Sequence, residues 1–244
     1  PFLKPILITL GILTFLATWN DFMWPLIVLT EQKLHTLPVA LAGLTPFVLV
    51  ANPSVPANNV RELIDLAKKE PGKLSAATLG NGSSTHLVLS MLRGATGADI
   101  LDVPYKGSSP AMSDLVAGHV DLFFDAITTS LPHIQAGRLK AIAMTSEKRS
   151  QAAPSIPTFA EAGTPNMLAY SWYGLLAPAG TPDAITDKLN AAVNEALASE
   201  EIRKKFLTEG AEARMISATA FGDLIAAHSK TWGAVIKSLG IRLD

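Results

Sequence analysis

Cysteine is absent from this chain of 244 residues, and neither acidic nor basic residues are in clear excess. Without cysteine the protein has no thiol chemistry, no disulfide bonds and no cysteine-ligated zinc. The formal net charge is -1 and no lysine or arginine cluster occurs, which argues against a nucleic-acid surface because phosphate binding needs a concentrated positive stripe. The 5 histidines show no metal-ligand spacing, so we expect no metal site.

Strongly polar residues are scarce from Pro5 to Thr30, where only Asn20 and Asp21 interrupt an apolar run. A helix of about 20 apolar residues already spans a bilayer core, so this run is a candidate transmembrane helix. The alternatives are a buried core helix, which should show a polar stripe, and a signal peptide, whose apolar region is shorter. Lys4 weakly favours a cytoplasmic N-terminus. Everything after Thr30 would then lie on the outer side of the membrane.

Beyond residue 45 the pattern changes to short apolar segments that alternate with amphipathic ones. Strands are predicted at FVLVA, LSAAT, DILDVPY, HVDLFFDAI, LKAIAMT and YSWYGLLAP. Helices are predicted between the first five of them, at VRELIDLAKKEPGK, STHLVLSMLRGATG, SPAMSDLVAG and LPHIQAG. This alternation indicates parallel strands with crossover helices, and therefore an α/β fold.

The last part of the chain is mainly helical. Two long amphipathic helices are predicted at 182–199 and 218–239, a shorter one at 200–207, and one further strand at EARMIS. The apolar faces of these helices need a sheet to cover. We therefore expect the tail to be the outer layer of a lobe whose central strands are missing from this chain.

The segment TLGNGSSTH is the sharpest local signal in the sequence. Gly80 and Gly82 allow positive φ and close backbone approach, and Ser83 or Ser84 can cap the helix that follows. The free N–H groups of a first helical turn, with the hydroxyls, form an anion site that needs no formal positive charge. The alternative is a well-capped turn that binds nothing. Neither a Walker A loop nor a dinucleotide fingerprint is present.

The segment PYKGSSPA repeats this device after the next strand, with Gly107 in the turn, Ser108 and Ser109 at the cap and Pro110 at the first helical position. Lys106 is expected to be solvated. Asp125 ends a third strand and is followed by AITTS, which adds a carboxylate and hydroxyls. Carboxyl ends of parallel strands share one sheet edge, where ligands of open α/β sheets bind.

A hydrolase is a third interpretation, because His86, Asp125 and Ser84 are the residue types of a catalytic triad. No Gly-x-Ser-x-Gly elbow is present. A serine and a histidine two residues apart at a helix start also point in different directions. We therefore expect that the protein is not an enzyme.

From residue 46 to 244 the chain resembles the substrate-binding proteins of tripartite tricarboxylate transporters, also called Bug proteins. The motifs that carry the resemblance are VLVANPSVPANNVRELIDLAKKEPGKLSAATLGNGSSTHL, VPYKGSSPAMSDLVAGHVDLFFDAI, LPHIQAGRLKAIAMTSEKRS, SIPTFAEAG and WYGLLAPAGTPDAITDKLNAAV. The resemblance implies a two-lobed fold of the type II periplasmic-binding-protein kind, which closes on a small carboxylate. It implies membrane transporter subunits as partners, a periplasmic location, no catalysis and no cofactor.

The resemblance also implies a set of ligand-binding residues, namely Gly82, Ser83, Ser84, Gly107, Ser108 and Asp125. It divides the chain into a first hinge strand at 45–52, a complete second lobe at 53–172 and the C-terminal part of the first lobe at 173–244. Trp172 and Tyr173 would fall in the second hinge crossing.

Residues 1–44 depart from this family. The segment PFLKPILITLGILTFLATWNDFMWPLIVLTEQKLHTLPVALAG resembles the C-terminal part of a carbohydrate-type ABC transporter permease. The resemblance implies an apparent chimera, with one hydrophobic helix in place of the first part of lobe 1. We expect impaired binding, because half of the cleft is missing. The rival function is an inner-membrane permease component of an ABC sugar transporter.

Overall fold

The computed structural model describes residues 36–208 and 210–239. Its strands are β1 (Thr36–Ala51), β2 (Ser75–Thr78), β3 (Leu101–Pro104), β4 (Leu122–Ala126), β5 (Lys140–Met144), β6 (Tyr170–Pro178) and β7 (Glu212–Ala213). Its helices are α3 (Val60–Lys69), α4 (Ser84–Thr96), α5 (Ser108–Ala117), α6 (Ile127–Gln135), α7 (Asp183–Ala198), α8 (Glu200–Thr208) and α9 (Ala218–Leu239). The α/β class and the order of these elements agree with the sequence prediction.

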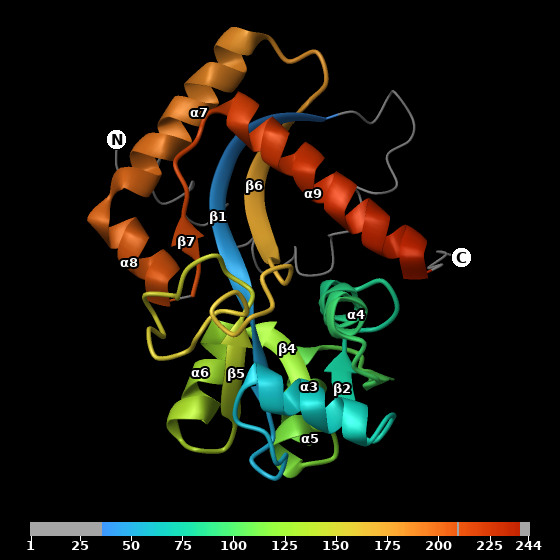
Figure 1. Cartoon of the computed structure of the whole chain (residues 1–244). Helices are drawn as coiled ribbons and strands as arrows, with labels where there is room; N and C mark the ends of the chain where they lie inside the picture. The colour runs from blue at the N-terminus through green and yellow to red at the C-terminus, as the bar shows by residue number, and fades with distance from the viewer. Residues whose placement is uncertain (1–35, 209, 240–244) are drawn as a thin grey trace.

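The long strand β1 runs through both lobes of the molecule (Figure 1). From Thr36 to Pro46 it pairs antiparallel with β6, and from Phe47 to Ala51 it pairs antiparallel with β4 and β5. The upper lobe in Figure 1 contains the first half of β1 with β6, β7, α7, α8 and α9, and the lower lobe contains β2 to β5 with α3 to α6. The predicted boundary between residues 44 and 45 therefore lies inside one strand.

The lower lobe is built on strands in the order β3-β2-β4-β1-β5. Strand β2 is parallel to both β3 and β4, as the alternation of strands and helices predicts. Strand β1 is antiparallel to its neighbours because it enters this sheet from the upper lobe, against the direction of the crossover strands.

Alternation along β4 shows how the lower sheet is covered on both faces. Leu122 and Phe124 belong to a core with residues of α3 and α4, whereas Phe123 belongs to a second core with residues of α5 and α6. All three side chains are buried, and the Phe124 ring stacks on the Phe159 ring at 6.0 Å. The lower lobe is therefore a three-layer sandwich, helix on sheet on helix.

The upper lobe packs α9 against the β1 and β6 ribbon. Phe221 on α9 is fully buried with Leu41 and Leu44 of β1, and its ring meets Trp172 edge-on at 5.3 Å. Gly174 permits this contact, because a Cβ atom there would lie 2.2 Å from Phe221 Cζ. The glycine is thus required by close packing and not by a turn.

Thr145, at the end of β5, ties together the two segments that connect the lobes. Its buried hydroxyl accepts a hydrogen bond from the Phe47 amide (2.9 Å) and lies 2.6 Å from the Ala169 carbonyl, to which it donates. The change of pairing partner in β1 falls between Pro46 and Phe47, and the second connection lies before Tyr170. The predicted second hinge differs from this, because Trp172 and Tyr173 lie within β6 and pair with Leu44 and Gly43.

The predicted transmembrane run 5–30 lies outside the described residues. Within residues 36–208 and 210–239, no helix is both long enough and apolar enough to cross a membrane.

Candidate functional site

Three strand-to-helix turns lie at one edge of the lower sheet. Strands β3, β2 and β4 are neighbours in that order and run parallel, so the turns after Thr78, Pro104 and Ala126 share the carboxyl edge. Helices α4, α5 and α6 begin at these turns. Because β1 runs from the upper to the lower lobe and β4 is antiparallel to it, this edge faces the upper lobe (Figure 1). The structure therefore brings the predicted ligand-binding segments to one side of the interlobe region.

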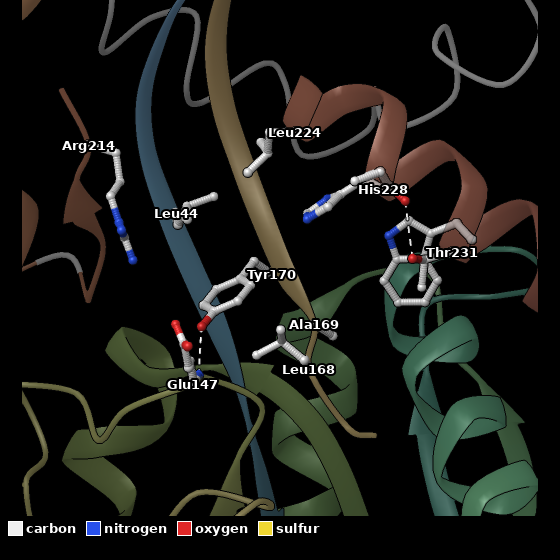
Figure 2. A pocket seen from close by; sticks show the side chains of 11 residues that line it. Leu44, Glu147, Leu168, Ala169, Tyr170, Arg214, Leu224, His228 and Thr231 are labelled. Atoms are coloured by element: carbon white, nitrogen blue, oxygen red, sulfur yellow. Dashed lines mark hydrogen bonds between the residues drawn. The ribbon is translucent and has the colours of Figure 1, made fainter. Parts of the chain in front are cut away.

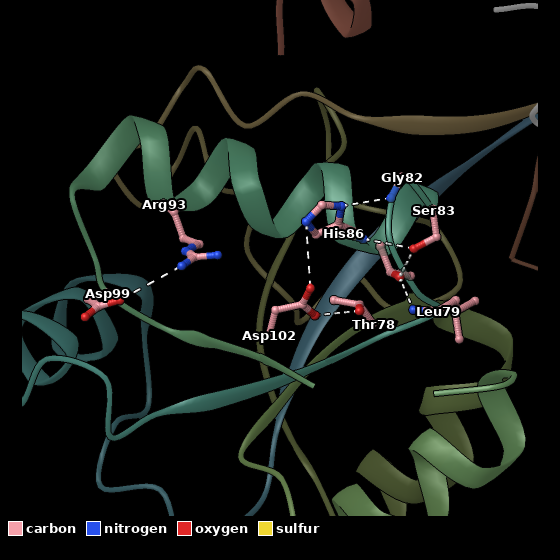
Figure 3. Close-up of polar contacts among 9 residues, drawn as sticks. Thr78, Leu79, Gly82, Ser83, His86, Arg93, Asp99 and Asp102 are labelled. Atoms are coloured by element: carbon pink, nitrogen blue, oxygen red, sulfur yellow. Dashed lines mark hydrogen bonds and ion pairs between the residues drawn. The ribbon is translucent and has the colours of Figure 1, made fainter. Parts of the chain in front are cut away.

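The turn after β2 is held by hydrogen bonds within the loop (Figure 3). Ser83 is the N-cap of α4, and its Oγ accepts a hydrogen bond from the His86 amide at 3.3 Å. Gly82 adopts a φ of 74°, and its amide donates to His86 Nδ1 at 3.0 Å. Thr85 Oγ1 accepts from the Leu79 amide at 2.8 Å. The Gly82 amide and the Ser83 hydroxyl, both predicted to contact a ligand, thus already have partners in the loop.

Ser84 occupies a different position from Ser83. It is the first residue of α4 and is half-buried, and no hydrogen bond of its hydroxyl occurs among the described residues. The amides of a first helical turn have no partner within the helix. Of the three predicted residues in this loop, Ser84 is the one whose hydroxyl remains open to a ligand.

His86 connects the loop to the next strand. Its Nε2 lies 3.7 Å from Asp102 Oδ2 on β3, and Asp102 Oδ1 accepts a hydrogen bond from Thr78 Oγ1 at 2.5 Å. From the sequence, His86 was considered only as a hydrolase residue. The contact between Gly82 and His86 spans four positions, a separation at which a helical side chain can reach back to the loop before its helix.

The turn after β3 has no side-chain cap. Gly107 is the N-cap of α5 with a φ of 131°, and Ser108 is the first helical residue. This corrects the predicted helix start at Pro110 by two residues. Because glycine carries no capping oxygen, the amides of Ser108 and Ser109 in the first turn are left to solvent or to a ligand. Lys106 is exposed, as expected for a solvated lysine.

Asp125 lies at the end of β4 and is 5% exposed. Its Oδ2 accepts hydrogen bonds from Thr129 Oγ1 and, at 3.0 Å, from Ser130 Oγ, both on α6. Burial raises the pKa of the Asp125 carboxyl, and the hydrogen bonds from Thr129 and Ser130 oppose this rise. The carboxylate therefore stabilises the first turn of α6. The sequence places a carboxylate and hydroxyls together here but does not show that they bond to one another.

A pocket of about 400 Å³ lies apart from these turns, at the junction of the lobes (Figure 2). It is lined mainly by α9 and by residues 168–170. The lining residues are Leu44, Glu147, Leu168, Ala169, Tyr170, Arg214, Leu224, Ala227, His228, Thr231 and Trp232. The Tyr170 hydroxyl accepts from the Glu147 amide at 2.7 Å, and burial lowers the pKa of His228. No predicted site residue lines this pocket. Sequence reasoning missed it because its residues come from separate segments that form no motif.

Residues able to chelate a metal are not grouped in the described ranges, which contain no set of three or more His, Cys, Asp or Glu side chains placed to hold one. The turns at the carboxyl edge instead combine backbone amides and hydroxyls, donors that suit an anion. A two-lobed α/β fold with such donors between its lobes is the arrangement of a solute-binding protein.

The chain belongs to the tripartite tricarboxylate transporter receptor family, whose model matches residues 9–241. This confirms the resemblance to Bug proteins. The chain is 37% identical over 201 residues to the UPF0065 protein in the tcbD-tcbE intergenic region of Pseudomonas sp. strain P51, and 36% identical over 207 residues to BugT of Bordetella pertussis. These matches cover 82% and 85% of this chain, and 60% and 64% of the two relatives.

Two solved structures from Rhodopseudomonas palustris are similar to this one. Rpa4515 with adipate has a TM-score of 0.75 at 34% identity, and covers 86% of this chain and 71% of its own. MatC with bound malate has a TM-score of 0.72 at 28% identity, and covers 89% of this chain and 74% of its own. The two-lobed solute-binding fold is thereby confirmed.

A short match points to a second family. The permease AraQ of an arabinooligosaccharide transport system from Halalkalibacterium halodurans is 46% identical over 48 residues, which is 19% of this chain and 17% of that protein. This match agrees with the permease resemblance of residues 1–44. The receptor family model also reaches into this region, since it begins at residue 9.

Proposed function

We propose that this chain is the extracytoplasmic solute receptor of a tripartite tricarboxylate-type transporter, and that it binds a small carboxylate at the carboxyl edge of β2, β3 and β4. The observation that carries the proposal is the pair of helix N-termini, α4 and α5, which follow neighbouring parallel strands. Each supplies first-turn amides and the positive end of a helix dipole, and together they favour an anion.

The proposed contacts differ in kind. Ser84 contributes a hydroxyl, and Ser108 and Gly107 frame the uncapped start of α5. Gly82 and Ser83 shape the loop that carries Ser84, since both donate or accept within it. Asp125 supports the edge by holding the start of α6. The ligands of Rpa4515 and MatC, adipate and malate, support a carboxylate as the ligand class.

Periplasmic location and docking to the membrane subunits of the transporter are part of the same proposal. They are supported by membership of a receptor family, which is not a family of enzymes. The permease function is less favoured, because the permease match covers 19% of the chain whereas the receptor model covers residues 9–241.

The proposal is tested by NMR titration of the full chain with adipate, malate and citrate. We expect saturable shifts of the amides of Ser84 and Ser108 with at least one of them. Ser84→Ala should weaken binding by about 1 kcal/mol, because a hydrogen bond to a charged group is lost. The control Ser113→Ala, on the exposed surface of α5, should leave affinity unchanged.

Absence of saturable shifts with all three acids would contradict the proposal, and an unchanged affinity of Ser84→Ala would remove Ser84 from the site. The weak binding expected from half a cleft remains a prediction. A dissociation constant tighter than about 1 μM, or -8.2 kcal/mol, would contradict it.

A further inference from the structure

The imidazole of His86 lies between the loop after β2 and the strand β3 (Figure 3). Its Nδ1 receives the Gly82 amide at 3.0 Å, so Nδ1 carries no proton. The proton of a neutral ring must then be on Nε2, which lies 3.7 Å from the Asp102 carboxylate. The two neighbours of the ring therefore select one tautomer.

Burial supports a defined orientation of this ring. The His86 side chain is 13% exposed and that of Asp102 is 27% exposed. The other oxygen of Asp102 accepts a hydrogen bond from Thr78, which is fully buried at the end of β2. The contacts thus link four residues in sequence: Thr78 at the end of β2, Asp102 on β3, His86 on α4 and Gly82 in the loop that follows β2.

We propose that His86 is the positioning residue of the candidate carboxylate site: Nδ1 holds the Gly82 amide, and so fixes the loop that presents Ser84. The effect on ligand binding rests on the function proposed above. The effect on the loop does not, because the hydrogen bond to Gly82 is made without a ligand.

Three substitutions separate the two sides of the ring. In His86→Asn the side-chain oxygen comes near the place of Nδ1, so it can accept from Gly82 but does not reach Asp102. In His86→Gln the amide reaches toward the place of Nε2 and leaves Gly82 without its acceptor. His86→Ala removes both contacts. His119→Asn is the matched control, because His119 also pairs with a carboxylate, Asp114 at 3.3 Å, but is exposed and outside the loop.

The first measurement uses the full chain without ligand. Long-range proton–nitrogen NMR should show His86 with an unprotonated Nδ1, and amide exchange at Gly82 should be slow. We expect exchange about tenfold faster in His86→Gln and His86→Ala, and unchanged in His86→Asn and His119→Asn. A protonated Nδ1, or an unchanged exchange rate in His86→Ala, would overturn the positioning role.

The second measurement is titration of the same variants with adipate. His86→Gln and His86→Ala should bind about five- to tenfold more weakly than the parent chain, and His86→Asn within about twofold of it. If His86→Asn binds adipate as weakly as His86→Ala, the hydrogen bond between His86 and Gly82 does not determine the affinity, and the proposal fails. If the parent chain binds no adipate, the function proposal fails for this ligand, and the exchange data still decide whether His86 fixes the loop.

Discussion

The two lobes differ in how fully their helices are covered. In the lower lobe, α3 and α4 on one face of the sheet and α5 and α6 on the other bury their apolar residues in two cores. In the upper lobe, α8 has no buried residue, and Ile185 and Leu189 of α7 are 51% and 39% exposed. The helices of the described upper lobe are thus less fully covered than those of the lower lobe.

This difference bears on the predicted shortage of strands. The tail helices were expected to be an outer layer without its central strands. Within the described residues α7 and α9 pack on β1 and α8 on β7, and α9 also packs on α4 of the lower lobe, where Trp232 joins the core. Amphipathic patterning therefore identifies which face of a helix is apolar. It does not identify the strands or helices that pack against that face, which only the tertiary structure shows.

The largest expected contrast between the lobes is in core truncation. Phe124→Ala in the lower core should reduce the free energy of unfolding by about 3–5 kcal/mol, because it leaves a cavity next to Phe159. Leu189→Ala on α7 should cost less than about 1 kcal/mol, since the side chain is already partly in water. Urea denaturation of both variants measures this. Equal costs would mean that α7 is covered in solution.

The upper lobe has a tightly packed contact where α9 crosses β6. Gly174→Ala should reduce stability by about 2–3 kcal/mol, because the new Cβ atom would overlap Phe221. In the control Gly233→Ala no atom lies within 4 Å of the added Cβ atom, and the helix should gain up to about 1 kcal/mol. Thermal unfolding followed by circular dichroism distinguishes them. A tolerated Gly174→Ala would show that this packing is loose.

The Thr145 hydroxyl adds hydrogen bonds to the backbone bonds that already join Thr145 to Phe47 and Ala169 at the connections between the lobes. Thr145→Val keeps the shape but removes the bonds to Phe47 and Ala169, and should cost about 2 kcal/mol. Thr145→Ser keeps both bonds and should cost about 1 kcal/mol for the lost methyl group. Denaturant unfolding provides the values. A Thr145→Ser variant less stable than Thr145→Val would contradict the importance of these bonds.

The smallest expected effect concerns pH and His228 in the junction pocket. Burial lowers the pKa of His228 in the folded state, so the unfolded state binds a proton first as the pH falls. Stability should therefore decrease as the pH falls below the unfolded pKa of about 6.5, until the folded pKa is passed. In His228→Phe this contribution should be lost, which unfolding at pH 7.5 and 5.5 measures. An unchanged pH dependence would exclude it.

Several elements could be predicted closely from local pattern. The bounds predicted for α9, 218–239, agree with the structure. Those of α7 differ by one residue at each end, and those of α8 by one residue at its C-terminal end. Strong amphipathic periodicity and clear stop signals explain this success. Helix α6 begins before the predicted segment, because Asp125 and its partner hydroxyls start it where no glycine or proline marks the turn.

The candidate site was predictable in outline and not in detail. Glycine and serine after each strand indicate a turn and a cap, so the edge of the sheet could be assigned. The sequence does not distinguish whether the Ser83 or the Ser84 hydroxyl caps α4. The structure assigns Ser83 to the cap, and it pairs Gly82 with His86.

What the sequence determined by itself is local: the alternation of strands and helices and the glycine-containing turns follow from residue spacing and backbone preference within short segments. The family was recognised separately, from the resemblance of whole motifs to known proteins, and the family model confirms it. Only the tertiary structure decided that β1 continues through both lobes, that Gly174 admits Phe221, and that Thr145 joins the two connections. Each of these depends on contacts between residues far apart in the chain, which no local pattern specifies.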